Sequence, residues 1–160
     1  MADAHEIKLP CGRVALIDAA DLHLTEGFKL YSEVRKYTVY VQCHKKGLPH
    51  GRYIYLHKLI TGWERTDHRD RDALNNRRSN LRECTNAQNC RNSGKRPGRN
   101  PYKGVTIQKS TGKWTARVCV DYKNLYVGLF DTPEEAAKAY DAAARIHHGE
   151  FAWLNFPDAR

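Results

Sequence analysis

The sequence contains no apolar run long enough to cross a membrane, and its N-terminus lacks the profile of a signal peptide. It has five cysteines, an odd number, and none of them forms a C-x-x-C pair. This count argues against a disulfide framework and against a zinc knuckle. We therefore expect no zinc and a reducing cytosol.

Apolar residues make up 41% of the sequence, and leucine, isoleucine and valine contribute only a modest share of them. We therefore expect any hydrophobic core to be small. No internal repeat is visible, and 160 residues suffice for one compact domain or two small ones. No basic amphipathic helix is found that would carry the chain to an anionic membrane surface. We therefore expect no membrane partner.

Positive charge is what the sequence has in excess. Lysine and arginine number 27 against 18 aspartates and glutamates, which gives a net charge of +9, and the isoelectric point is near 9.4. Such a balance indicates a polyanionic partner, and nucleic acid is the first candidate.

A stretch rich in glycine, proline and basic residues divides the chain. Residues 92–100, NSGKRPGRN, show no periodicity and are typical of a linker. We therefore predict an N-terminal domain over 1–95, a linker over 96–100 and a C-terminal domain over 101–160.

The N-terminal part contains three strand-like runs, at 12–18, 36–43 and 52–56. The turn residues KKGLPHG separate the second run from the third, so these two are expected to form a hairpin. Thr85 and Gln88 have the spacing of a capping box, which predicts a helix beginning near Asn86.

The C-terminal part reads as three strands followed by one helix. YKGVTIQ, KWTARVCVD and KNLYVGLFD predict a three-stranded antiparallel meander. In TPEEAAKAYDAAARIHHG, Thr132 is the expected N-cap, Pro133 the first helical residue, Glu135 the partner in a capping box and Gly149 the end. The fold class is therefore α+β.

Charge separates within this second part. Residues 103–123 carry five lysines and arginines against one aspartate, a net +4, whereas residues 131–150 carry two against five acids, a net −3. A basic sheet backed by an acidic helix would present the sheet to phosphates.

The segment 66–82, TDHRDRDALNNRRSNLR, gathers acidic residues in a strongly basic region. A hard divalent cation needs oxygen ligands, which Asp67 and the side-chain carbonyl of Asn89 would supply beside His68. The spacing of the acids does not fit an EF-hand loop, whose twelfth position would be Arg78. Asp70 and Asp72 are expected to tune the charge of the loop or to pair with neighbouring arginines.

The motif DH…NNRRSNLRECTNAQNCRN resembles the signature of phage-type HNH homing endonucleases. The resemblance implies N-terminal β-hairpins followed by a ββα-metal (His-Me finger) nuclease unit that holds one Mg²⁺ or Mn²⁺ ion. It makes Asp67 and Asn89 the metal ligands, His68 the general base and Asn80 the amide that orients the loop, with Asn92 as the alternative ligand. Phosphate contacts would come from Arg77, Arg78 and Arg82.

Residues 102–156 are similar throughout to the ethylene-response-factor (Apetala-two type) DNA-binding domain, by the landmarks YKGV, GKW, TPEEAA and LNF. In that family a three-stranded sheet enters the major groove and one helix packs behind it. The resemblance implies that the residues facing DNA are Lys103, Gln108, Lys109, Lys113, Arg117, Asn124 and Tyr126.

Together the two resemblances imply a metal-dependent DNA endonuclease, a phosphodiester hydrolase that nicks duplex DNA. We expect a monomer or weak dimer without a small-molecule cofactor, in the cytoplasm of a bacterial host if a phage encodes it. The alternative is a DNA-binding regulator with an inactive nuclease fold. RNA binding is a third hypothesis, for which exposed aromatic pairs are missing from the sequence.

Overall fold

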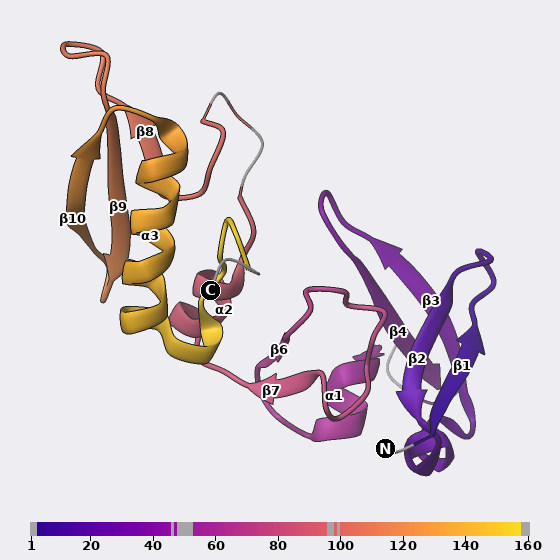
Figure 1. The fold of residues 1–160 in the computed structure, drawn as a ribbon. Helices are drawn as coiled ribbons and strands as arrows, with labels where there is room; N and C mark the ends of the chain where they lie inside the picture. Colours follow the sequence, from indigo (N-terminus) through magenta and orange to yellow (C-terminus); the bar gives the residue numbers. More distant parts are fainter. Residues whose placement is uncertain (1–2, 46, 48–52, 96–97, 99, 158–160) are drawn as a thin grey trace. The chain divides into compact units, whose positions relative to one another are not determined.

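The computed structural model describes residues 3–45, 47, 53–95, 98 and 100–157. The chain forms two compact units, Met1–Thr85 and Asn86–Arg160 (Figure 1). The helix that begins at Asn86 therefore belongs to the second unit, ten residues before the predicted domain limit. The predicted linker falls partly outside the described residues, and the predicted domain limits stay a prediction.

The first unit opens with a hairpin, in which β1 (Ala4–Lys8) pairs antiparallel with β2 (Val14–Asp18). The strand expected at 12–18 is thereby confirmed. A 3-10 helix, η1 (Ala19–Thr25), follows directly.

A three-stranded antiparallel sheet comes next, in the order β3 (Phe28–Val34), β4 (Val39–Lys45) and β5 (Ile54–Tyr55). The expected hairpin is confirmed because β4 pairs with β5, although most of its turn lies outside the described residues. Strand β3 was not predicted from the sequence; it pairs along its length with β4.

Alternation along β4 decides which face of this sheet meets the core. Val41 and Cys43 are buried, whereas their neighbours Tyr40 and Gln42 belong to the other face. The short helix α1 (Leu56–Thr61) adds its own apolar side chains to the same core. The buried cluster of this unit consists of Leu9, Ala15, Ile17, Val41, Cys43, Leu56, Ile60 and Leu81.

Two short strands, β6 (Thr66–His68) and β7 (Leu81–Glu83), pair antiparallel at the end of the first unit. Helix α2 (Asn86–Asn92) follows and confirms the predicted helix start. A ββα-metal nuclease unit is nevertheless not shown, because the two strands lie in the first unit and α2 lies in the second. The confirmed part of the fold prediction is the mixed α+β class.

The second unit confirms the predicted meander and helix. Strands β8 (Val105–Ile107), β9 (Trp114–Val120) and β10 (Lys123–Phe130) form an antiparallel sheet with β9 in the centre. Helix α3 (Pro133–His148) lies across one face of this sheet, and a 3-10 turn, η2 (Gly149–Phe151), ends it (Figure 1).

The start of α3 is capped as predicted. The hydroxyl of Thr132 accepts a hydrogen bond from the backbone N–H of Glu135, and the carboxylate of Glu135 accepts one from the backbone N–H of Thr132. Its buried face is mostly alanine, so the helix approaches the sheet closely. Tyr140 is the large exception, and its ring fills the space where a Cβ at Gly104 would stand.

A buried carboxylate fastens the C-terminal segment to α3. Asp141 is 2% exposed and accepts hydrogen bonds of 2.8 Å from the backbone N–H groups of Asn155 and Phe156. The side-chain oxygen of Asn155 in turn accepts from the backbone N–H of Lys103 at 2.8 Å. From the sequence alone, Asp141 contributes only to the negative charge of the helix region, since no local pattern shows that residues 155 and 156 return to it.

Within the described residues, no helix combines the length and the apolar character that a membrane span requires.

Candidate nucleic-acid interface

The predicted cation ligand Asp67 lies in a buried ion pair. On β6 it stands opposite Arg82 on β7, and Nη2 and Nε of Arg82 lie 2.6 and 2.8 Å from the same carboxylate oxygen. The two residues are only 5% and 6% exposed. A buried pair with short contacts holds the two strands in register, so Arg82 acts inside the unit rather than on its surface.

His68, the predicted base, is buried beside other polar rings. Its Nε2 lies 3.3 Å from the amide oxygen of Asn76, and its ring meets that of His57 edge-on with the ring centres 5.3 Å apart. Burial lowers the pKa of His68, and it lowers the pKa of His57 to about 4. Both imidazoles are therefore neutral at neutral pH.

Asn80 joins the two ends of the loop between β6 and β7. Its Nδ2 donates to the carboxylate of Asp70 at 2.8 Å and to the carbonyl of Asn75 at 2.7 Å, and its Oδ1 accepts from the backbone N–H of Asp70 at 3.0 Å. Asp70 and Asp72 each accept a backbone N–H two residues further on, at 2.8 and 3.0 Å. The acidic side chains thus fold the loop.

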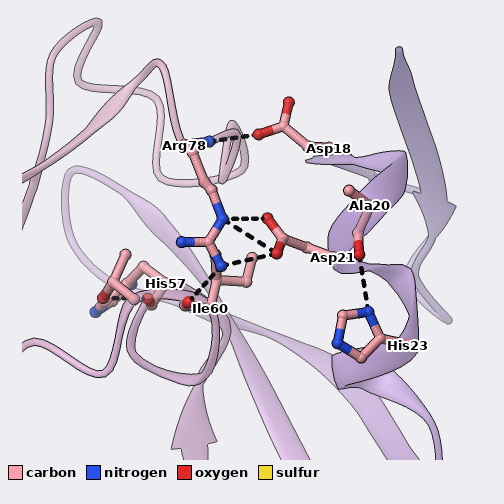
Figure 2. A network of polar contacts seen from close by, with 8 residues as sticks. Asp18, Ala20, Asp21, His23, His57, Ile60 and Arg78 are labelled. Atoms are coloured by element: carbon pink, nitrogen blue, oxygen red, sulfur yellow. Dashed lines mark hydrogen bonds and ion pairs between the residues drawn. The ribbon is translucent and has the colours of Figure 1, made fainter. Parts of the chain in front are cut away.

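The neighbouring arginines are also engaged within the first unit. The guanidinium of Arg78 reaches both carboxylate oxygens of Asp21 on η1 and donates to the carbonyl of Ile60 at 3.0 Å (Figure 2). Its backbone N–H donates to Asp18 at 2.8 Å. Arg77 donates to the side-chain oxygen of Asn75 at 3.0 Å. These contacts tie the loop to η1 and α1.

Asn89, the second expected ligand, is exposed on α2 in the second unit, and the alternative ligand Asn92 is buried there. The expected pair of ligands is therefore divided between the units. Among the described residues, no three His, Cys, Asp or Glu side chains gather in a way that could hold a metal ion. The Mg²⁺ or Mn²⁺ ion, the role of Asn80 and the role of His68 stay predictions.

The second unit presents a polar sheet face on the side away from α3, which we call the open face. On β9, Ala116 and Val118 are fully buried under the helix, so the alternating Arg117 and Cys119 point to the other side and are exposed. In the register of the sheet, Tyr126 on β10 stands opposite Arg117, and Asn124 stands opposite Cys119. Three of the expected DNA contacts, Arg117, Asn124 and Tyr126, therefore lie side by side.

Three further expected contacts lie at the turn that joins β8 to β9. The backbone carbonyl of Gln108 accepts from Gly112 at 2.9 Å and closes the turn, which leaves Gln108 and Lys109 exposed. Lys113 lies 2.9 Å from Asp131 in a solvent-exposed pair, which holds the lysine only weakly.

Lys103 has a structural position. Its Nζ donates to the backbone carbonyls of Arg91 and Ser93 at 2.7 and 2.6 Å, at the C-terminal end of α2. The same Nζ lies 5.6 Å from the centre of the Trp153 ring. A lysine that caps a helix end in this way stabilises the negative pole of the helix.

Comparison with known proteins identifies the second unit. Residues 101–147, from the start of the sheet region to the end of α3, match the family model of the AP2 domain. Over 72 residues the chain is 43% identical to the AP2-like ethylene-responsive transcription factor ANT of Arabidopsis thaliana, a match that covers 44% of this chain and 13% of that protein. The resemblance of this part to the ethylene-response-factor domain is confirmed.

Two further relatives are similar to this chain and are also named as proteins of the ethylene-responsive or APETALA2-like type. The chain is 43% identical over 67 residues to the ethylene-responsive transcription factor ERF010 of Arabidopsis thaliana, covering 41% of this chain and 36% of that protein. It is 45% identical over 64 residues to the APETALA2-like protein 2 of Oryza sativa subsp. japonica, covering 39% and 14%. The chain thus spans only about an eighth to a third of the length of these curated relatives.

The prediction of an HNH endonuclease is wrong. The matched relatives are named as transcription factors, and neither they nor the AP2 match shows an HNH part. The expectations of a hydrolase, of nicking and of a phage source are corrected with it. The location in a bacterial host cytoplasm is wrong too, because these relatives are proteins of plants.

Proposed function

We propose that this chain is a DNA-binding regulator of transcription, and that the open face of the second unit binds duplex DNA. The observation that carries the proposal is the position of Arg117. It is exposed on the central strand β9, directly opposite Tyr126, on the face that α3 leaves uncovered.

The geometry of this face suits the major groove, which admits a β-ribbon. Arg117 would donate to base edges from the centre of the sheet, and Asn124 and Tyr126 would flank it on β10. Gln108 and Lys109, at the β8–β9 turn, would reach the phosphates beside the groove. Lys113 would join them, because an exposed pair with Asp131 is readily exchanged for a phosphate.

The distribution of charge also favours binding of DNA to the open face. The region of the sheet and its turns carries a net +4, while the helix region behind it carries a net −3. The polyanion is therefore drawn to the sheet and repelled from the helix. Arg117 is the single arginine between residues 101 and 130, so guanine readout would depend on one side chain, with lysines adding affinity more than sequence choice.

The test compares Arg117→Ala with Lys138→Ala in a titration of labelled duplex DNA, after selection of a preferred sequence from a random pool. Loss of one base-contacting arginine is expected to weaken binding by about 5- to 150-fold and to relax the sequence preference. Lys138 is exposed on α3, on the other side of the sheet, so its removal should leave the affinity nearly unchanged. Equal losses in the two variants would contradict the proposed face.

A reporter gene preceded by the selected sequence tests the regulatory role. Its expression should change with the intact chain and should not change with Arg117→Ala. One open face per chain is enough for binding, so we propose a monomer or weak dimer that needs no small-molecule cofactor. Sedimentation of the chain with and without duplex checks the stoichiometry.

A further inference from the structure

The first unit carries a row of aromatic rings on the sheet face that is turned away from its core. Val41 and Cys43 of β4 are 1% and 0% exposed on the core side. The opposite face therefore receives their neighbours along the strand, together with the residues paired to them on β3 and β5. The row consists of Tyr31, Tyr40, His44, Tyr53, Tyr55 and His57.

These rings are in continuous contact. The centroids of Tyr31 and His44 lie 5.2 Å apart, those of His44 and Tyr53 5.6 Å, and those of Tyr53 and Tyr55 5.2 Å. Tyr55 then stacks on His57 at 5.3 Å with an interplanar angle of 9°. The contacts of Tyr31 with His44 and of Tyr53 with Tyr55 are edge-to-face, with interplanar angles of 88° and 77°, so the rings form one continuous aromatic cluster rather than scattered tyrosines.

A network of polar contacts fixes the rings in place. The hydroxyl of Tyr55 donates to the carboxylate of Glu33 at 2.7 Å and accepts from Arg35 at 2.6 Å. Arg35 also pairs with Glu33 at 3.2 Å, and the hydroxyl of Tyr53 lies 3.3 Å from that of Tyr55. Rings held in this way lose little conformational entropy when a ligand binds.

The row is accessible to a ligand. Tyr31 is 42% exposed, and Tyr40, His44, Tyr53, Tyr55 and His57 are all half-buried rather than buried. Aromatic side chains that stay accessible in a contiguous group mark a binding surface, because an ordinary core would have covered them.

The charge around the row is positive. Between residues 28 and 45, four lysines and arginines stand against one glutamate, a net charge of +3 with histidine neutral. Lys29 is paired with His44 across the sheet, so it lies on the same face as the row. Glu33 is the only acid in this segment, and its contacts with Arg35 offset its charge. A ligand that is flat, aromatic and anionic fits these properties.

We propose that this face binds an unpaired nucleic-acid strand, with bases stacked on Tyr31, His44 and Tyr53 and phosphates near Lys29 and Arg35. Stacking needs the flat faces of the bases, which a duplex buries within its own helix and an unpaired strand exposes. This surface lies in the first unit and is additional to the open face proposed for duplex binding. It takes a strand of any sequence, because every base has a π-face.

The experiment measures the binding of fluorescein-labelled oligo(dT) to the full chain by anisotropy. We expect Tyr31→Ala and Tyr53→Leu each to weaken binding about tenfold, the effect of losing one base–aromatic stack. Tyr37→Ala is the matched control, because Tyr37 is 67% exposed in the hairpin between β3 and β4 but lies outside the row. It should leave the affinity unchanged. Circular dichroism shows whether each variant is folded.

The second arm titrates the same variants with duplex DNA, and Arg117→Ala with oligo(dT). If the two surfaces are separate, Tyr31→Ala leaves duplex binding intact and Arg117→Ala leaves strand binding intact. Oligo(U) in place of oligo(dT) shows whether the strand is RNA or DNA, and tighter binding of either supports the proposal.

Three results would overturn it. Oligo(dT) binding that is absent, or equally strong in folded Tyr31→Ala, shows that the row holds no bases. Parallel losses for strand and duplex show that the face contacts phosphates alone. A change in sedimentation of the DNA-free protein on Tyr31→Ala, without any strand binding, shows a contact between copies of the chain.

Discussion

The two units use their polar residues in opposite ways. Among the described residues of the first unit, eight polar ones are buried: Asp18, Asp21, Asp67, His68, Asn75, Asn76, Asn80 and Arg82. In the second unit the buried polar residues of the described chain are Asn92, Thr115, Asp141 and His148, and the sheet keeps its arginine exposed. Buried polar groups are therefore more numerous among the described residues of the first unit, whereas the second unit keeps the arginine of its sheet on the surface.

The arginines show what this difference means. Arg82 and Arg78 lie in the arginine-rich stretch 66–82, yet each forms short contacts with a buried carboxylate of its own unit. Arg117 is the single arginine of strand β9 and is exposed. Positively charged residues in a sequence therefore indicate a polyanionic binding partner only when they are not already paired with carboxylates inside the fold.

The largest expected effect tests the buried pair of the first unit. Arg82→Ala leaves the carboxylate of Asp67 without its guanidinium, which should lower the free energy of unfolding by about 3–5 kcal/mol. Urea denaturation measures the loss, and hydrogen exchange assigns it to residues 3–85. The matched change in the second unit, Lys113→Ala, breaks an exposed pair and should cost less than about 1 kcal/mol. Similar losses for both would mean that the interiors do not differ as described.

A double variant separates pairing from packing. Asp67→Leu combined with Arg82→Leu removes both charges together, so most of the lost stability should return. A double variant as unstable as Arg82→Ala would show that hydrogen bonds of these residues to other groups, rather than their mutual pairing, hold the strands.

The next effect concerns the close packing of the second unit. In Gly104→Ala, the added Cβ meets the ring of Tyr140, and φ is +74°, so the loss should be about 3 kcal/mol from overpacking and strain. Gly112→Ala is the control, because φ is +71° but nothing lies within 4 Å. It should cost about 1 kcal/mol, the backbone contribution alone. Thermal unfolding of both variants gives the difference.

The third effect is a dependence on pH. Partial burial lowers the pKa of His57 to about 4, so as the pH falls the unfolded chain takes up this proton before the folded chain does. Stability of the first unit is therefore fully present above pH 6.5 and is lost as the pH falls toward 4, by about 2 kcal/mol between pH 7 and pH 5. His57→Phe keeps a flat ring beside Tyr55 and should flatten this slope. If the free energy of unfolding of His57→Phe depends on pH as strongly as that of the unaltered chain, His57 is not the cause of the dependence.

The smallest effect tests a feature that sequence alone predicts in the second unit. Thr132→Ala removes the side-chain acceptor of the capping box at α3 and should cost about 1 kcal/mol. Thr132→Ser keeps the hydroxyl and should behave like the unaltered chain in the same thermal scan. A loss in both would point to the methyl group rather than to the cap.

Local rules of the chain predicted most of the second unit. The capping residues of α3, its glycine stop and the alternation of β9 are encoded within a few neighbouring residues, so each can be recognised without the rest of the fold. Strand β3 was not predicted for the opposite reason, because its formation depends on pairing with the strand β4.

The candidate site was predicted less well. Asp67, His68 and Asn80 were recognised as a group, and the structure places them around one loop. Their role as a metal centre stays a prediction. The endonuclease activity inferred from that metal centre is wrong, because the matched relatives are named as transcription factors. The aromatic row was missed altogether, because its members come from β3, β4, β5 and α1 and are scattered between residues 31 and 57. The spacing of neighbouring residues along the chain gives no signal for side chains that meet only across a sheet.

The sequence by itself determined the mixed α+β class, the helix with its caps, the meander and the positive charge, because these follow from the spacing of residues close together in the chain. Only the tertiary structure decided which charges are available to a partner. An ion pair such as Asp67 with Arg82 joins residues 15 apart, and one such as Asp21 with Arg78 joins residues 57 apart. Strand pairing and loop closure bring such groups together, and the spacing of neighbouring residues carries no record of them.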